Sequence, residues 1–157
     1  MVVREHQTLE MYNVLSYRDK ITQQELAIKS QEIEKILADM GVKKNGPVVT
    51  ATYAVEKGTT EAVMDVEILV PLDKEVVVPE GFTWKKHFLL TNALMVRHVG
   101  NPTRLSDTIN ELNNYIVVNG LVPITNGYNV TIKEAKTQQE LDEMIIEIYV
   151  GISPNIL

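Results

Sequence analysis

Two seven-residue segments that repeat at a distance of 80 positions constrain the fold of this chain more than any other feature. The first, Met64 to Val70, reads Met-Asp-Val-Glu-Ile-Leu-Val, and the second, Met144 to Val150, reads Met-Ile-Ile-Glu-Ile-Tyr-Val. Both are rich in the β-branched residues that strands favour. The repeat predicts a single domain over residues 1–157 that contains two copies of one structural unit, approximately residues 9–72 and 91–152.

The residues of the first copy predict a definite order of elements. A strand over residues 9–17 is followed by a helix that begins at Thr22 and ends at Gly41. Thr22 and Glu25 have the spacing of a capping box, and glycine is a common helix stop. Two strands, over residues 48–55 and 62–72, then follow and are joined by a polar hairpin loop over residues 56–60.

The second copy predicts the same plan. After a strand over residues 93–99, Asn101-Pro102 provides an N-cap and a proline at the first helical position, and Asn119-Gly120 ends the helix. The closing strands are expected over residues 128–134 and 144–152. Two β-α-β-β units predict an α+β fold with one mixed, mostly antiparallel, concave sheet and both helices on one face. The opposite face would form an open trough.

Alternation along the strands predicts which residues face this trough, because successive side chains point to opposite faces of a sheet. In the last strand one face is wholly apolar and should pack on the helices: Met144, Ile146, Ile148 and Val150. Glu147 and Tyr149 then project into the trough. Glu67 does the same from the first copy.

A carboxylate beside an aromatic ring on a concave sheet suits a cationic organic ligand, because the carboxylate supplies charge and the ring supplies a π face. Other aromatic side chains that could reach the trough are Tyr53, Trp84 and Tyr115. Together with Glu147, Tyr149 and Glu67 they form the predicted ligand site. The alternative is an ordinary polar sheet face that meets water.

Composition excludes several other classes of function. The formal net charge of −6 argues against nucleic acid as a direct partner, since phosphate binding needs a basic surface. The chain has no cysteine, and none of its three histidines lies three or four residues from another, so no metal site is expected. Glycine-rich phosphate loops are absent, and we expect no cofactor. Without a signal segment or an apolar membrane span, a cytoplasmic protein is expected.

Short motifs in the second half carry a family resemblance. They are the segment Ala93 to Gly100, the helix through Leu112 to Ile116, the Asn119-Gly120 stop, the turn Asn126-Gly127-Tyr128 and the strand Glu147 to Val150. In this order they resemble the GyrI-like small-molecule-binding family, which includes the effector-binding domains of multidrug-responsive regulators. The duplicated plan of the first half extends the resemblance over nearly the whole chain.

The resemblance implies a duplicated β-α-β-β fold with a central ligand cavity, in which Glu147 pairs with cationic ligands. This sequence departs from the family pattern at three positions. Asn101 stands where a glycine precedes the proline, Thr103 stands where an aromatic residue often follows it, and Gly151 stands where a proline closes the last strand. The first ~20 residues are too short for a helix-turn-helix, so a stand-alone copy of the binding domain is expected rather than a complete regulator.

Three hypotheses about function follow. The first is a binding module for a small hydrophobic molecule, with a cation as the ligand that Glu147 favours. The second is a protein-interaction module of the gyrase-inhibitor kind. The third is a hydrolase that uses Glu67 and Glu147 as a carboxylate pair, and we expect binding rather than catalysis. His98 has no nucleophile partner and is expected to be a surface or locally hydrogen-bonded residue.

Overall fold

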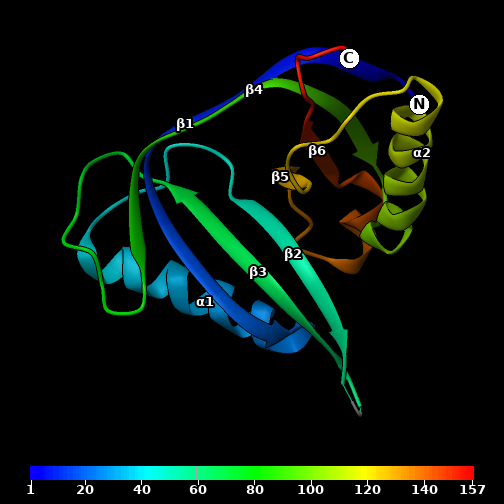
Figure 1. Cartoon of the computed structure of the whole chain (residues 1–157). Helices are drawn as coiled ribbons and strands as arrows, with labels where there is room; N and C mark the ends of the chain where they lie inside the picture. The colour runs from blue at the N-terminus through cyan, green and yellow to red at the C-terminus, as the bar shows by residue number, and fades with distance from the viewer. Residues whose placement is uncertain (59) are drawn as a thin grey trace. The chain divides into compact units, whose positions relative to one another are not determined.

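The computed structural model of the chain describes residues 1–58 and 60–157. Thr59, in the predicted hairpin loop, lies outside the described residues. The chain forms two compact units: unit 1 comprises Met1–Glu10 and Leu89–Leu157, and unit 2 comprises Met11–Phe88. In chain order the elements in Figure 1 are β1 (Val3–Thr22), α1 (Gln23–Met40), β2 (Val49–Lys57), β3 (Ala62–Pro71), β4 (Thr83–Val99), η1 (Pro102–Arg104), α2 (Leu105–Val118), β5 (Tyr128–Lys133), η2 (Gln138–Glu143) and β6 (Ile145–Gly151).

Unit 2 is built around β3, which pairs antiparallel with β1 on one side and with β2 on the other. Leu15 of β1 lies opposite Val70 of β3, and Val49 of β2 lies opposite Leu69. The first residues of β4, up to Phe88, also belong to this unit. The antiparallel pairing of the two strands that follow the helix is as the sequence predicts.

Helix α1 covers one face of the unit 2 sheet, as Figure 1 shows. Its buried residues are Ile33 and Leu37, which pack with alternate residues of the strands. The predicted capping box is present: the Thr22 hydroxyl accepts from the Glu25 amide, and the Glu25 carboxylate accepts from the Thr22 amide. Gly41 ends the helix with a φ of 67°, a left-handed conformation that glycine adopts without a steric penalty.

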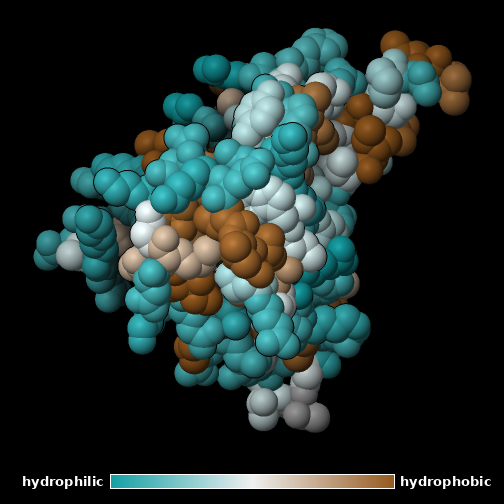
Figure 2. Space-filling model, turned by 90° about the vertical axis from the view of Figure 1, so that its left-hand side faces the viewer, coloured by the Kyte–Doolittle hydropathy of each residue, from teal (hydrophilic) through white to brown (hydrophobic). Residues whose placement is uncertain are grey.

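The segment between β3 and β4 closes the end of this core. Val76, Val78 and Phe82 are partly buried against it, whereas Val77 between them is exposed. Figure 2 looks onto this side of the molecule and shows apolar groups gathered at its centre with hydrophilic groups around them. The strand predicted at 93–99 is the second part of a longer strand, β4, which begins at Thr83 and runs without a break to Val99.

Unit 1 has the same internal plan. Its central strand is β6, which pairs antiparallel with β4 and with β5. Helix α2 packs on one face through Leu112 and Ile116. At the start of this helical segment, the Asn101 side chain accepts from the Thr103 amide and Pro102 occupies the first turn of η1. The predicted N-cap at Asn101 is therefore confirmed, although it caps η1, which leads directly into α2.

The two units also share local irregularities. Each unit has a register shift in the strand after its helix, at positions that are 79 residues apart. Each also has an isolated bridge that joins the loop after the helix to the end of the central strand. The paired features are the shifts at Thr52/Ala54 and Thr131/Lys133, and the bridges Lys44–Leu72 and Pro123–Ile152.

These observations confirm the α+β class and the antiparallel pairing. The concave form of the sheet, the position of both helices on one face and the origin of the two units by duplication are not confirmed. A single domain with repeats at residues 9–72 and 91–152 stays a prediction. Within the described residues, neither α1 nor α2 combines the length and the apolar character that a membrane span requires.

Candidate functional site

The alternation predicted for β6 is present in the structure. Ile146, Ile148 and Val150 belong to the core that packs on α2, and Met144 is partly buried against it. Glu147 and Tyr149 consequently project from the face of the unit 1 sheet that lies away from α2. The same holds in unit 2, where Ile68 and Val70 pack with α1 and leave Glu67 on the other face.

Glu147 is buried, with 7% of its surface exposed, and both of its carboxylate oxygens have side-chain partners. Arg97 donates to Oε2 through Nη2 at 2.6 Å and through Nε at 3.1 Å. The hydroxyl of Tyr149 donates to Oε1 at 3.2 Å. The side chain of Arg97 is about half exposed, with 52% of its surface accessible. A buried carboxylate is thus held between an aromatic residue and a more exposed cation.

Tyr149 stays in its neutral form over a wide pH range. Burial raises the pKa of its phenol, and the nearby charge and hydrogen bond of Glu147 raise this pKa further, while Arg97 lowers it. The phenol is therefore a dependable hydrogen-bond donor to Glu147 at neutral pH. Its half-buried ring offers an aromatic surface beside the carboxylate.

Glu67 is slightly more buried than Glu147, with 4% of its surface exposed. Ser16 donates to Oε2 at 2.5 Å, Tyr53 donates to Oε1 at 2.6 Å, and the ammonium of Lys85 lies 2.8 Å from Oε2. Burial acts to raise the pKa of Glu67, but the hydrogen bonds from Lys85, Ser16 and Tyr53 outweigh it. The pKa consequently lies below its ordinary value, so Glu67 is ionised at neutral pH.

A β-bulge directs Tyr53 towards Glu67. The register of β2 shifts between Thr52 and Ala54, and Tyr53 is the extra residue at this point. The Arg18 guanidinium lies over the Tyr53 ring at 4.0 Å from its centroid and forms a bidentate ion pair with Asp65. Tyr53, one of the aromatic residues expected to reach the trough, therefore joins Glu67 in unit 2.

Two of the predicted site residues lie elsewhere. Trp84 is partly buried against the core beneath α1, and Tyr115 is partly buried against the core beneath α2. Both therefore lie on the helix-covered sides of their sheets, away from the faces that carry Glu67 and Glu147. Their placement follows from the strand register and helix rotation, which the residue pattern around them did not specify.

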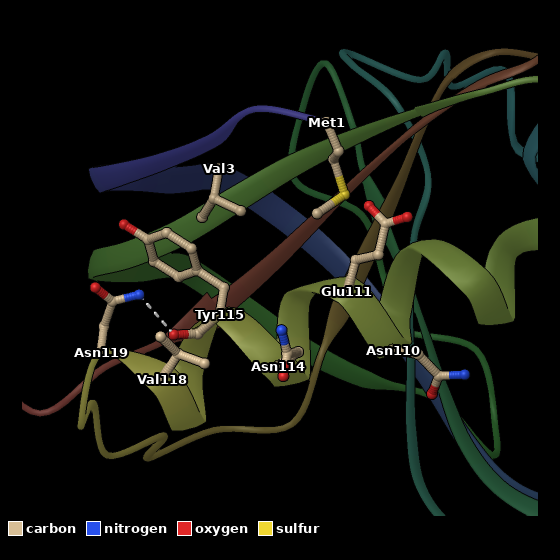
Figure 3. Close-up of a pocket in the computed structure, with 8 residues that line it drawn as sticks. All are labelled: Met1, Val3, Asn110, Glu111, Asn114, Tyr115, Val118 and Asn119. Atoms are coloured by element: carbon tan, nitrogen blue, oxygen red, sulfur yellow. Dashed lines mark hydrogen bonds between the residues drawn. The ribbon is translucent and has the colours of Figure 1, made fainter.

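Tyr115 takes part in a separate surface hollow of about 530 Å³ in unit 1. Figure 3 shows its ring beside Val3, with Glu111 and Met1 at the other end of the hollow. The Tyr115 hydroxyl donates to Glu5 at 2.9 Å, and the Asn119 side chain donates to the Tyr115 carbonyl oxygen at 2.8 Å. The Tyr115–Glu5 contact fastens the N-terminal part of β1 to α2, and the Asn119 contact lies within the end of α2.

His98 is buried, with 7% of its surface exposed, so of the two expected alternatives it is the locally hydrogen-bonded one and not the surface one. The expected local hydrogen bonding is present. Its Nδ1 lies 2.7 Å from the Thr108 hydroxyl and its Nε2 lies 3.0 Å from the Asn101 carbonyl oxygen. Because a carbonyl oxygen only accepts, Nε2 donates, and His98 ties the end of β4 to η1 and α2.

Three partners of the glutamates are not among the site residues that the sequence predicts: Arg97, Lys85 and Ser16. Arg97 lies directly opposite Glu147 in the β4–β6 ladder, so a correct strand register would have identified it. Lys85 is remote from Glu67 in sequence and lies in a stretch with no strong strand pattern. Among the described residues, no group of three or more His, Cys, Asp or Glu side chains is arranged to hold a metal ion.

Comparison with known proteins supports the fold. No protein-family model matches the chain, and none of the curated proteins searched matches it. Among solved structures, the crystal structure of the EcmrR C-terminal domain matches with a TM-score of 0.78 and 17% identity, covering 98% of this chain and 99% of that one. The fold is that of the GyrI-like domains.

Two further structures share this GyrI-like fold. EcmrR in a cryo-EM complex with DNA matches with a TM-score of 0.76 and 18% identity, over 97% of this chain. The present chain spans 58% of that EcmrR chain. The structure of SAV2435 bound to tetraphenylphosphonium matches with a TM-score of 0.56 and 14% identity, over 96% of this chain and 95% of that one. These structures support the α+β fold with antiparallel pairing, whereas the duplication and the central ligand cavity that the resemblance implies stay predictions.

Proposed function

We propose that this protein binds a small, apolar aromatic molecule on the face of β6 that carries Glu147 and Tyr149. The observation that carries the proposal is the buried Glu147 carboxylate, held by Tyr149 and Arg97 on the sheet face that α2 leaves uncovered. Buried charged groups are costly unless they are paired and hydrogen-bonded, as Glu147 is. The tetraphenylphosphonium complex of SAV2435, which shares the fold, supports an aromatic ligand.

Tyr149 would provide the main contact surface for such a ligand. Its phenol is anchored at one end by the hydrogen bond to Glu147, which fixes the ring without using its faces. A fixed aromatic ring contributes apolar contact area at a low cost in conformational entropy. Stacked or edge-to-face contact with an aromatic ligand adds about 1 kcal/mol beyond the area that it buries.

The hydrolase hypothesis receives less support from the same geometry. A general base needs an accessible lone pair and a pKa near the working pH. Both oxygens of Glu67 accept hydrogen bonds, and the pKa of its carboxyl is lowered rather than raised. Glu67 is therefore a weak base and a poor proton donor. The protein-interaction hypothesis rests on the family resemblance alone.

Titration calorimetry and thermal unfolding with an uncharged aromatic probe, triphenylmethanol, would test the proposal. We expect the probe to raise the unfolding temperature of the wild-type protein. Tyr149→Ala removes the ring and should weaken binding at least ~10-fold, whereas Tyr149→Phe keeps the ring and should change it by less than ~3-fold. Tyr12→Ala, at an exposed tyrosine of unit 2, is the matched control and should bind as the wild type does.

Two results would contradict the proposal. One is the absence of any stabilisation or heat of binding with the wild-type protein across a panel of uncharged aromatic probes. The other is equal affinity of the wild type and Tyr149→Ala, which would place the binding site somewhere else.

A further inference from the structure

Both buried glutamates already have a cation of their own within the same unit. Glu147 is paired with Arg97 at 2.6 Å, and Glu67 is paired with Lys85 at 2.8 Å. In each case the carboxylate is nearly inaccessible while its partner is partly exposed, at 52% for the Arg97 side chain and 37% for that of Lys85. Each carboxylate is thus neutralised by a cation that is more accessible to solvent than the carboxylate itself.

The sequence explains why Arg97 binds Glu147. In unit 2 the residue opposite Glu67 is also an arginine, Arg18, but Arg18 forms its ion pair with Asp65 instead. Two residues before Glu147, the corresponding position is occupied by Ile145. Arg97 has no acidic residue there, and its described ion pair is with Glu147.

Arg97 and Glu147 therefore neutralise each other in direct contact on this face of unit 1. A lipophilic cation would have to displace the Arg97 guanidinium or share Glu147 with it, and would gain little for the loss of its own hydration. An anion would have to compete with Glu147 for the same guanidinium. An uncharged molecule meets neither penalty and still gains the contact with Tyr149.

We propose that Arg97 determines ligand specificity, by acting as a built-in counter-ion that makes the Glu147 site select uncharged aromatic molecules over lipophilic cations. This inference rests on the proposed binding of aromatic molecules at Tyr149 and Glu147. It differs from the ligand that the sequence alone suggests, since Glu147 read without its cross-strand neighbour predicts a site for cations.

The test uses three probes of similar aromatic shape and different charge: triphenylmethanol, tetraphenylphosphonium and tetraphenylborate. Their affinities would be measured for the wild type, Arg97→Met, Glu147→Gln and the double variant Arg97→Met/Glu147→Gln. Arg97→Met leaves the Glu147 carboxylate without its cation. This variant should bind tetraphenylphosphonium at least ~10-fold more tightly than the wild type does. The affinity for triphenylmethanol should change less than the affinity for tetraphenylphosphonium does, because triphenylmethanol carries no charge.

The other variants complete the cycle. Glu147→Gln leaves Arg97 alone, so it should bind the cation more weakly than the wild type and tetraphenylborate more tightly. The double variant is again neutral and should return towards the wild-type ratio. If Arg97→Met does not fold, the comparison of Glu147→Gln with the double variant isolates Arg97, and removal of Arg97 should raise the affinity for the cation at least ~10-fold.

The outcomes separate this inference from the proposed function. If triphenylmethanol binds the wild type but removal of Arg97 leaves the affinity for tetraphenylphosphonium unchanged in both backgrounds, the counter-ion role is wrong and the binding function stands. The same conclusion follows if the wild type prefers the cation to the uncharged probe. If no probe binds any variant, the proposed function itself fails. Arg97→Lys keeps the charge and should show no gain for the cation.

Discussion

Arg97 and Glu147 lie directly opposite each other in the β4–β6 ladder, and the Arg97 Nη2 donates to the Glu147 Oε2 at 2.6 Å. Arg18 and Glu67 are opposite each other in the β1–β3 ladder in the same way. Arg18, however, pairs with Asp65, and Glu67 depends on Lys85 and two hydroxyl groups. Equivalent backbone positions thus carry different electrostatic arrangements.

The first prediction concerns the stability that the Arg97–Glu147 pair provides. Arg97→Met should lower the free energy of unfolding by about 2 kcal/mol at neutral pH, because it leaves a buried carboxylate without its cation. This figure is below the usual cost for a fully buried pair, since Arg97 is half exposed. Arg18→Met should cost clearly less, because the Arg18–Asp65 pair is more accessible to water. Urea unfolding of both variants would measure the difference, and equal losses would contradict it.

The second prediction concerns pH and Glu67. The pKa of Glu67 is lowered in the folded state, so the folded protein holds this proton less readily than the unfolded chain does. The resulting stabilisation is fully present above the ordinary glutamate pKa of 4.5 and is lost as the pH falls through the lower folded-state value. The wild type should therefore lose stability progressively below about pH 4.5.

Glu67→Gln removes this titration and provides its control. The variant should be less stable than the wild type at pH 7, because a carboxylate that pairs with Lys85 is replaced by a neutral amide. The difference between the two proteins should shrink as the pH falls, when measured by urea unfolding at a series of pH values from 7 to 3. A constant difference over this range would show that Glu67 does not titrate with unfolding.

The sequence predicts those features of the fold that depend on local patterns. Thr22 with Glu25 and Asn101 with Pro102 mark the two helix starts, because capping is a contact between near neighbours in the chain. Alternation in β6 places Glu147 correctly, since the apolar set around it has a strict period of two. These inferences need no knowledge of which strand lies beside which.

The partners of the glutamates depend on non-local pairing, and for that reason the sequence does not reveal them. Arg97 is 50 positions from Glu147, and only the register of β4 against β6 brings the two together. Tyr53 reaches Glu67 through a bulge, which shifts the alternation by one residue. Trp84 and Tyr115 are predicted site residues only because they are aromatic: the residues around Trp84 have no clear alternation, and Tyr115 lies on a helix, where strand alternation does not apply.

The third prediction concerns the helix start at Thr22. Thr22→Ala removes the hydroxyl that accepts from the Glu25 amide, and it should lower the free energy of unfolding by about 1 kcal/mol. Thr22→Ser keeps the oxygen and should retain most of the stability. Thr137→Ala is the matched control, since Thr137 precedes η2 without a capping hydrogen bond from its side chain. A loss at Thr137 equal to that at Thr22 would show that capping is not the cause.

The fourth prediction concerns Gly151, which stands where a proline closes the last strand in the GyrI-like pattern. The amide of Gly151 donates to the Thr125 hydroxyl at 2.9 Å, and proline has no such donor. A Cβ atom at this position would lie 2.8 Å from Cδ1 of Leu90 and 2.9 Å from Cγ2 of Thr125. Gly151→Ala should therefore cost about 2 kcal/mol through steric overlap, and Gly151→Pro more than about 3 kcal/mol.

A double-mutant cycle with Thr125→Ser would test this explanation. Serine keeps the hydroxyl that accepts from Gly151 and removes the methyl group that an alanine at 151 would meet. Gly151→Ala should accordingly be less destabilising in the Thr125→Ser background than in the wild type, by roughly 1 kcal/mol of coupling between neighbours in contact. Thermal or urea unfolding of the four proteins gives this coupling directly. Additive effects would mean that the space around Gly151 is not what selects glycine there.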